Sequence, residues 1–137
     1  MKHEKSCGAV IFREDENTSR RFYLILKSTQ GHTTLCKGHV EKNETEHETA
    51  TREIMEETGL TVDFIDGFRE VITYSPFANC TKDVVFFLAR VSGGRLACQP
   101  EEVADARFLP FDAALDTLTH ASDKAILQEA HSFLQNR

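Results

Sequence analysis

The sequence has no tryptophan and only three prolines in 137 residues. It contains no Pro- or Gly-rich linker and no internal repeat, so we expect one domain covering residues 1–137. No apolar run approaches the roughly 18 residues that a membrane-spanning helix needs. The apolar run Cys7–Phe12 is too short for the core of a signal peptide. These absences predict a cytoplasmic protein without membrane contact.

The cysteine spacing and the charge argue against two further kinds of partner. Four cysteines are present, none in a CxxC pair, which favours reduced thiols over a zinc site. The net charge of −6 gives no overall attraction for nucleic acid, so we expect no stable nucleic-acid partner. We also expect the protein to be a monomer. The acidic residues are unevenly placed, with a dense run of glutamates at Glu41, Glu44, Glu46, Glu48, Glu53, Glu56 and Glu57.

The hydrophobic pattern indicates a mixed α/β fold. Strands are expected at Ser6–Phe12, Phe22–Leu26, Val84–Val91 and Ala104–Leu109, with one bent or two short strands in Val62–Tyr74. Loops are expected at Arg13–Arg21 and Gln30–Thr34, and a turn at Ser92–Gly94. Two helices close the chain, and the second carries apolar residues at helical spacing: Ile126, Leu127, Ala130, Phe133 and Leu134.

The glutamate run contains a third helix with clear start and stop signals. Thr45 and Glu48 fit a capping box, in which each side chain bonds to the other residue's backbone N–H. Gly59 supplies a left-handed stop. The helix is therefore expected to run from about Glu46 to Thr58.

Three carboxylates gather on one edge of this expected helix. At about 100° per residue, Glu53, Glu56 and Glu57 fall within an arc of about 100°. Each like-charged pair costs a few tenths of a kcal/mol on a bare helix. A solvated acidic face would leave that repulsion uncompensated, whereas hard cations such as Mg²⁺ bind carboxylate oxygens and can bridge a polyphosphate. We therefore favour a metal site over a solvated face.

The residues around this edge complete a longer motif. Gly38 is followed after five residues by Glu44, and after seven more by Arg52–Leu60, which reads Arg-Glu-Ile-Met-Glu-Glu-Thr-Gly-Leu. The Nudix box has this spacing, and every fixed position is filled. A chance match is on the order of 10⁻⁹ per starting position. The chain therefore resembles the Nudix hydrolases.

That resemblance implies a fold, a reaction and a set of roles. The fold would be an α/β/α sandwich around a mixed sheet. Glu53, Glu56 and Glu57 would bind Mg²⁺, with Mn²⁺ as an alternative, and the Gly38 carbonyl would add a ligand. Arg52 would orient the glutamates, and Glu44 would support the loop and helix. Water activated by the metal would attack a phosphorus atom, with a glutamate accepting its proton.

A narrower resemblance, softer than the box, extends over nearly the whole chain. The chain is similar to diadenosine tetraphosphate (Ap4A) hydrolases in four segments: Ser6–Phe12, Lys37–Glu41, Asp105–Pro110 and the C-terminal helix. This similarity implies cleavage of Ap4A to ATP and AMP. That family usually has Trp and Pro ahead of the box, where this chain has Thr33 and Cys36. Threonine cannot stack on a base, so Thr33 is expected to weaken adenine binding.

Several residues outside the box are candidates for substrate contacts. Lys37 and Lys82 could hold phosphates, Tyr74 could stack on adenine, and His32 could stack on or hydrogen-bond the nucleotide. Their alternatives are surface lysines, a sheet aromatic and a loop histidine. Glu101 or Glu102 could bind metal or assist the water, the alternative being loop solubility. Surface or packing roles are expected for the remaining candidate histidines, His3, His47, His120 and His131.

Two rival functions stay open. One is a Nudix hydrolase with another substrate: an RNA 5′ end, a diphosphoinositol or a damaged nucleoside triphosphate. An RNA 5′ end would favour a basic groove, which a net charge of −6 does not suggest. The other is a catalytically silent nucleotide sensor, which the complete set of box glutamates disfavours.

Overall fold

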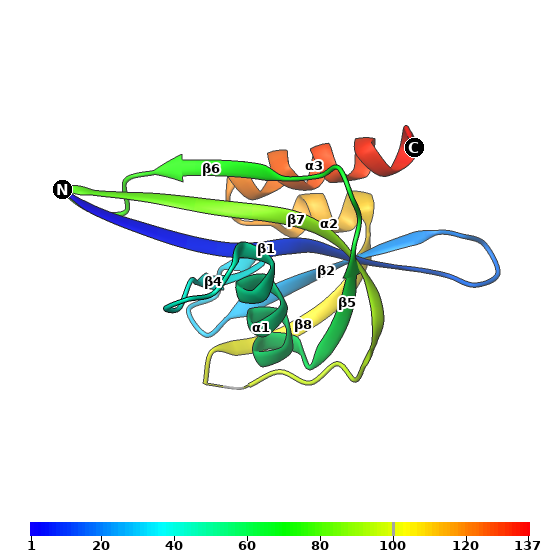
Figure 1. Ribbon diagram of the computed structural model, residues 1–137. Coiled ribbons are helices and arrows are strands. Elements are labelled where there is room, and N and C mark those ends of the chain that lie inside the picture. Colours follow the sequence, from blue (N-terminus) through cyan, green and yellow to red (C-terminus); the bar gives the residue numbers. More distant parts are fainter. Residues whose placement is uncertain (100) are drawn as a thin grey trace.

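The computed structural model describes residues 1–99 and 101–137 as one mixed eight-stranded sheet with helices on both faces (Figure 1). The strands are β1 (Lys2–Glu14), β2 (Arg21–Ser28), β3 (Thr33–Thr34), β4 (Cys36–His39), β5 (Leu60–Phe64), β6 (Glu70–Tyr74), β7 (Cys80–Gly94) and β8 (Val103–Pro110). The helices are α1 (Glu46–Thr58), α2 (Phe111–Thr117) and α3 (Ala121–Gln135). No helix of the described chain has both the length and the apolarity needed to cross a bilayer.

Strand β1 lies at the centre of the sheet. It pairs antiparallel with β2 and β4, and parallel with β7 in a register that runs from Lys2 opposite Cys80 to Phe12 opposite Arg90. The segment Cys7–Phe12 is buried throughout, as expected for a strand covered on both faces. The mixed sheet inferred from the resemblance is therefore confirmed.

Two apolar cores lie on opposite faces of this sheet. Because side chains alternate along a strand, Ala9 and Ile11 pack on the α1 side, while Val10 and Phe12 pack beneath α2 and α3. The stripe on α3 is buried as the helical spacing predicted, although Phe133 is only partly buried. Figure 1 shows the resulting three layers, with α1 below the sheet and α2 and α3 above it. The α/β/α sandwich is confirmed.

The sheet departs from the expected pattern in several places. The turn expected at Ser92–Gly94 is wrong, because β7 continues to Gly94 and pairs with β5 across a register shift. Part of the expected loop Gln30–Thr34 is strand β3, paired with β2. Strand β4 was not anticipated, and β1 and β2 extend into the expected hairpin loop. Of the two alternatives for Val62–Tyr74, the structure has two short strands.

Candidate active site

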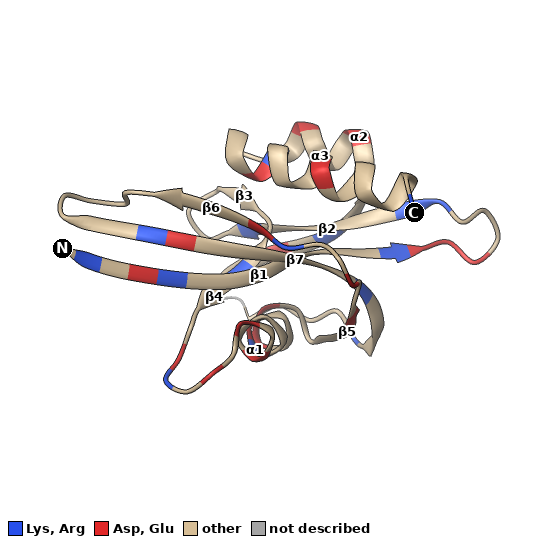
Figure 2. Cartoon of the chain, turned by 45° about the horizontal axis from the view of Figure 1, so that its top comes forward, with Lys and Arg blue, Asp and Glu red and all other residues tan. Residues whose placement is uncertain are grey.

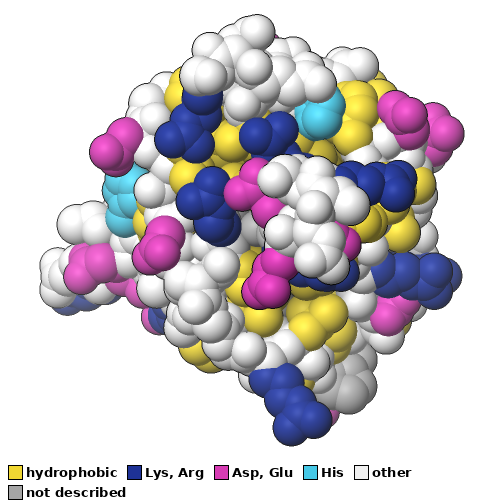
Figure 3. Space-filling model, turned by 90° about the vertical axis from the view of Figure 1, so that its right-hand side faces the viewer, with side chains coloured by type: hydrophobic (Ala, Val, Ile, Leu, Met, Phe, Trp, Pro, Cys, Tyr) yellow, Lys and Arg dark blue, Asp and Glu magenta, His cyan; other side chains and the backbone are white. Residues whose placement is uncertain are grey.

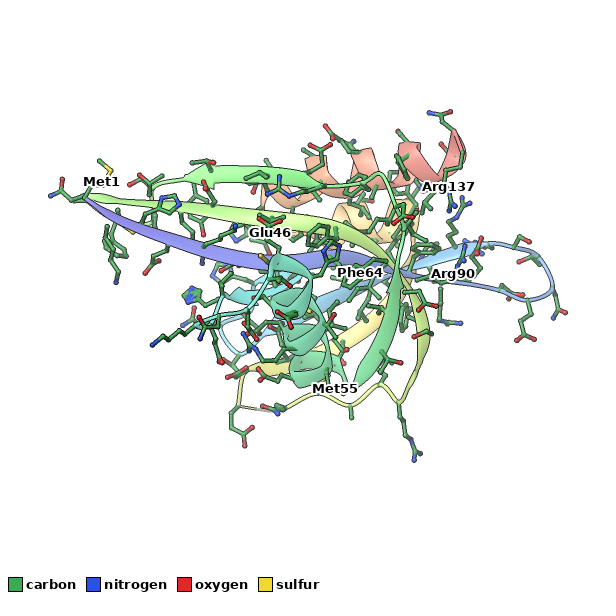
Figure 4. The ribbon with its side chains drawn as sticks, viewed as in Figure 1. Met1, Glu46, Met55, Phe64, Arg90 and Arg137 are labelled. Carbon is green, nitrogen blue, oxygen red and sulfur yellow. The ribbon has the colours of Figure 1, made fainter. Side chains whose placement is uncertain are left out.

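Helix α1 begins and ends as its sequence predicts. The Thr45 N–H donates to Glu48 Oε1 at 2.8 Å, and the Glu48 N–H donates to Thr45 Oγ1 at 3.1 Å. Gly59 ends the helix with φ 77° and donates its N–H to the Met55 carbonyl. In Figure 4, Glu46 lies at the start of α1 beneath the strands, and Met55 lies at the opposite end. The buried stripe of the helix fixes which edge presents the glutamates.

The Arg52 guanidinium ties the helix to the loop before it. Its Nε and Nη2 donate to the two Glu44 oxygens at 2.6 and 3.0 Å, and Nη2 also donates to the His39 carbonyl at 2.9 Å. Nη1 donates to Glu53 at 2.8 Å and to Glu56 at 3.2 Å. Bonding to Arg52, and then to the Glu41 N–H, lowers the pKa of Glu44 to about 2. One planar cation thus holds both the loop and the glutamates.

Gly38 leaves room for the Glu53 carboxylate. A Cβ at position 38 would collide with all three atoms of that carboxyl group, so a larger residue there would push the Glu53 carboxylate out of its present place. The Glu53 side chain is only 13% exposed. The backbone of β4 and a glutamate of α1 therefore meet at one point, which brings the Gly38 backbone next to an acidic oxygen.

We call Glu53, Glu56 and Glu57 together the glutamate edge, and Glu57, like Glu53, is partly buried in it. Burial, a hydrogen bond with Glu53 and the charge of Glu53 raise the pKa of Glu57 to about 8. The Cys36 thiol donates to Glu57 Oε1 at 3.6 Å, and burial raises the pKa of Cys36. With its pKa near 8, Glu57 would hold a proton at neutral pH in the metal-free protein, next to the Glu53 carboxylate.

The glutamate edge offers a donor set for a hard divalent cation. Its side-chain donors are all carboxylate oxygens, the ligand type that Mg²⁺ and Mn²⁺ prefer. Within residues 1–99 and 101–137, no three His, Cys, Asp or Glu side chains converge as a ready-made ligand set. Glu53 and Glu56 both turn to the Arg52 guanidinium, and Glu57 lies against Glu53. A cation would replace the proton of Glu57.

The other expected metal ligands, Glu101 and Glu102, lie in an exposed turn before β8. Neither side chain forms a hydrogen bond or ion pair with the glutamate edge in the described part of the chain. The structure therefore does not bring them into the site.

Two lysines lie on the other face of the sheet. Lys82 is only 9% exposed, and its Nζ lies 3.2 Å from His39 Nε2. Burial and the nearby Lys37 lower the pKa of Lys82. Neither ammonium has a carboxylate within ion-pair distance among the described residues. Acidic groups act on them only from longer range, Glu4 on Lys82 and Glu57 and Asp123 with Lys37, so both ammonium groups are open to an anion.

A pocket of about 460 Å³ adjoins Lys37. We call it the β6 pocket, and it is lined by Ile72, Tyr74, Val84, Phe86, His120 and Asp123. Lys37 and Gly38 are consecutive residues of β4, so the Lys37 side chain and the open side of the Gly38 Cα face opposite sides of the sheet. Lys37 borders this pocket, whereas Gly38 contacts Glu53. The pocket and the glutamate edge therefore share one strand.

The comparisons with known proteins agree with this geometry. The family model for the NUDIX domain matches residues 2–130.

The chain belongs to the NUDIX domain family.

This NUDIX chain is also similar to individual proteins. The asymmetrical bis(5′-nucleosyl)-tetraphosphatase of Sus scrofa is 35% identical over 141 residues, with 95% of each chain covered. The enzyme of the same name from Rattus norvegicus is also 35% identical, with the same coverage. A C. elegans Ap4A hydrolase in a binary complex superposes with a TM-score of 0.86 at 24% identity, covering 98% of this chain and 99% of the other.

The structure of this NUDIX chain places some of the expected substrate-binding residues at the β6 pocket and others outside it. Lys37 and Tyr74 line the β6 pocket, and Lys82 lies beside it. His32 is exposed and reaches the pocket only through His120, on which it stacks with ring centroids 5.5 Å apart.

Thr33 lies elsewhere. It lines a separate pocket of about 350 Å³ with Lys27 and Arg107, whereas Thr34 lines the β6 pocket. Alternation along β3 sends the two threonines to different places. The Thr33 N–H donates to Thr119 Oγ1 at 2.8 Å, which ties this strand to the start of α3. The structure thus gives no support to Thr33 as the missing base platform of the β6 pocket.

Three residues of the NUDIX site were not found from the sequence. His120, expected to be a surface or packing residue, lines the β6 pocket. Asp123 is buried there, and its signal was present, because it continues the apolar stripe of α3 one turn before Ile126. Cys36 was noted only as a departure from the family pattern and contacts Glu57.

Charge is distributed unevenly over this NUDIX fold. Figure 2 shows acidic residues along α1 and the loop before it. The face at the β1–β2 hairpin displays Lys and Arg side chains with Asp and Glu side chains between them (Figure 3). In this part of the fold, Arg13 lies over the rings of Phe22 and Phe108 at 5.1 and 5.0 Å.

Proposed function

We propose that this NUDIX chain hydrolyses bis(5′-nucleosyl) tetraphosphates, cutting Ap4A asymmetrically into ATP and AMP. The observation that carries the proposal is the Lys37–Lys82 pair, two cations without a carboxylate partner in the described chain. Lys37 lines a pocket that can take a nucleoside and belongs to β4, the strand that also borders the glutamate edge, whereas Lys82 belongs to β7. The named relatives with 35% identity support the same substrate class.

In this proposal the polyphosphate crosses β4 between the two faces of the sheet. Lys37 and Lys82 bind its phosphate oxygens through charge-assisted hydrogen bonds. Tyr74, a residue that lines the pocket and is 43% exposed, stacks on the base. His32 supports that stack through His120.

A divalent cation, for which we propose Mg²⁺ with Mn²⁺ as a substitute, would be held by Glu53, Glu56, Glu57 and the Gly38 carbonyl. When bound, it supplies Lewis-acid polarisation and lowers the pKa of a coordinated water. Arg52 holds the glutamates in place, and Glu44 fixes Arg52. One carboxylate of the Glu53–Glu57 pair accepts the proton of the attacking water.

Glu101 or Glu102 could add a ligand or assist the water, but only if the turn before β8 moves towards α1. Exchange of each for glutamine tests this, and a turnover within twofold of wild type would remove both residues from the site.

Product analysis tests the proposed function. The protein is incubated with Mg²⁺ and, separately, Ap4A, a triphosphorylated RNA 5′ end, a diphosphoinositol and a nucleoside triphosphate. Chromatography should find equimolar ATP and AMP from Ap4A and slower turnover of the others. Two ADP molecules as product, or faster removal of pyrophosphate from RNA, would contradict the proposal.

A further inference from the structure

A carboxylate lies in the wall of the β6 pocket. Asp123 belongs to the first turn of α3 and is only 5% exposed. It shares its helix face with Ile126 and Leu127, and the pocket beside it contains Ile72, Val84 and Phe86. An acidic side chain on an apolar stripe is uncommon, because burial penalises the charged form.

The partners of Asp123 do not use its full bonding capacity. It accepts a hydrogen bond from the Leu35 backbone N–H, and it has no ion pair in the described chain. An ionised carboxylate can accept about four hydrogen bonds. Burial raises the pKa of Asp123, while the Lys37 charge, the Leu35 N–H and His120 oppose that rise. The carboxylate therefore presents free acceptor positions where a ligand would lie.

The pocket around this carboxylate suits a flat group with N–H donors. Tyr74 and His120 offer ring faces, and His120 is held by its stack on His32. Guanine presents two adjacent donors, its N1–H and 2-amino group, which match the two oxygens of a carboxylate. Adenine presents one amino donor next to the N1 lone pair, which a carboxylate repels.

We propose that Asp123 reads the base in the β6 pocket and selects guanine over adenine. This inference rests on the proposed function and adds to it the base preference of the substrate. The best substrate would then be a bis(5′-nucleosyl) tetraphosphate with guanine in that pocket. The aromatic walls hold any base, and the carboxylate decides which base is held best.

The experiment compares kcat/KM for diguanosine tetraphosphate (Gp4G) and Ap4A with Mg²⁺. Wild type should favour Gp4G by about tenfold or more, the range expected for a paired base contact. Asp123→Asn should reverse the order, because an amide donates to adenine N1 and accepts from its amino group. Asn also keeps an oxygen for the Leu35 N–H, so the Tm should change little. Asp116→Asn, on the exposed face of α2, makes the same charge change outside the pocket and should keep the wild-type order.

Each other outcome has a separate meaning. Equal kcat/KM on both substrates in wild type, or an Ap4A preference, would overturn the inference and leave the proposed function standing. An equal loss on both substrates in Asp123→Asn would show that Asp123 only positions Lys37, which also overturns it. If neither substrate is cleaved, the proposed function fails, and calorimetric binding of GTP and ATP to the chelated protein decides the inference. Equal affinity for GTP and ATP would then overturn it.

Discussion

The two halves of α1 treat the same residue type in opposite ways. At the start of the helix, Arg69 and then Lys5 bind Glu46 and lower its pKa to about 2. The Lys5 Nζ lies 2.6 Å from Glu46 Oε2, and the Arg69 Nη2 lies 2.8 Å from the same oxygen. Further along, burial and the neighbouring Glu53 raise the pKa of Glu57 to about 8. The Glu46 carboxylate is thus paired with cations of the protein, whereas the Glu57 carboxyl group has none and favours its protonated form.

This difference separates structure from function within one helix. A carboxylate that serves the fold is neutralised by the chain itself, as Glu46 is. A carboxylate that binds a metal must stay available to it. Such a carboxylate lies close to a like charge, and the repulsion destabilises the metal-free protein. Arg52 connects the loop before α1 to the glutamate edge, because it binds Glu44 on one side and Glu53 on the other.

Removal of divalent cations tests whether the glutamate edge acts through a metal. In excess chelator we expect hydrolysis of Ap4A to fall by more than 10³-fold, since charge on the phosphate is then uncompensated. Added Mg²⁺ should restore it and raise the Tm, because a ligand that binds only the folded state stabilises it. Full activity after exhaustive chelation would contradict a metal role for the glutamate edge.

Replacing Glu57 should have the next largest effect. Glu57→Gln is expected to lower kcat by about 10³-fold, several kcal/mol at about 1.4 kcal/mol per tenfold. Its Tm in chelator should equal or exceed that of wild type, because like-charge repulsion is relieved. Glu46→Gln is the matched control and should keep near-normal kcat. Near-normal turnover in Glu57→Gln would mean that the glutamate edge is only a solvated face.

The connecting cation can be tested by a change that keeps its charge. Arg52→Lys should lower kcat or Mg²⁺ affinity by about 10–100-fold, the usual effect of losing a residue that orients metal ligands. Lysine is a point charge and cannot bridge Glu44, Glu53 and the His39 carbonyl together. Steady-state kinetics over a Mg²⁺ series would separate the two effects. Unchanged values of both would show that the bridge is not needed.

The smallest expected effect is on stability at the start of α1. Glu46 has a folded-state pKa below its ordinary 4.5, so its ion pairs stabilise the fold above that pH and are lost as the pH falls towards 2. Glu46→Gln should therefore lower stability by on the order of 1 kcal/mol at pH 7. The difference from wild type should vanish near pH 2. Urea titrations across this range measure it, and a pH-independent difference would rule out the ion pairs as the cause.

Local signals predicted α1 well, and long-range packing decided what they missed. The cap at Thr45 and the stop at Gly59 act over a few residues, so the sequence predicts the bounds of α1 correctly. Strand β4 is short, and its Lys37 and Gly38 are not typical strand residues. It forms because its backbone pairs with β1. The turn expected from Gly93 and Gly94 is overridden by pairing with β5.

The candidate site divides in the same way. Helix periodicity placed the three glutamates on one edge, because a helix fixes how residues three and four apart are arranged, and the resemblance to the Nudix box added Arg52. Asp123 and His120 reach the β6 pocket only because the start of α3 packs beside β4 and β6. No spacing rule connects residue 123 with residue 37. The side of β3 on which Thr33 lies also depends on register, which the sequence does not reveal.

The parallel pairing of β1 with β7 has a consequence for how the protein is made. The central strand β1 leaves the ribosome well before its parallel partner β7, which ends at Gly94. Until then Cys7–Phe12, an apolar segment with strong strand propensity, has only β2 and β4 beside it. Contacts between strands so distant in sequence slow folding and leave edges exposed to association with other chains. Nascent chains that stop before β7 should therefore be the species most dependent on chaperones.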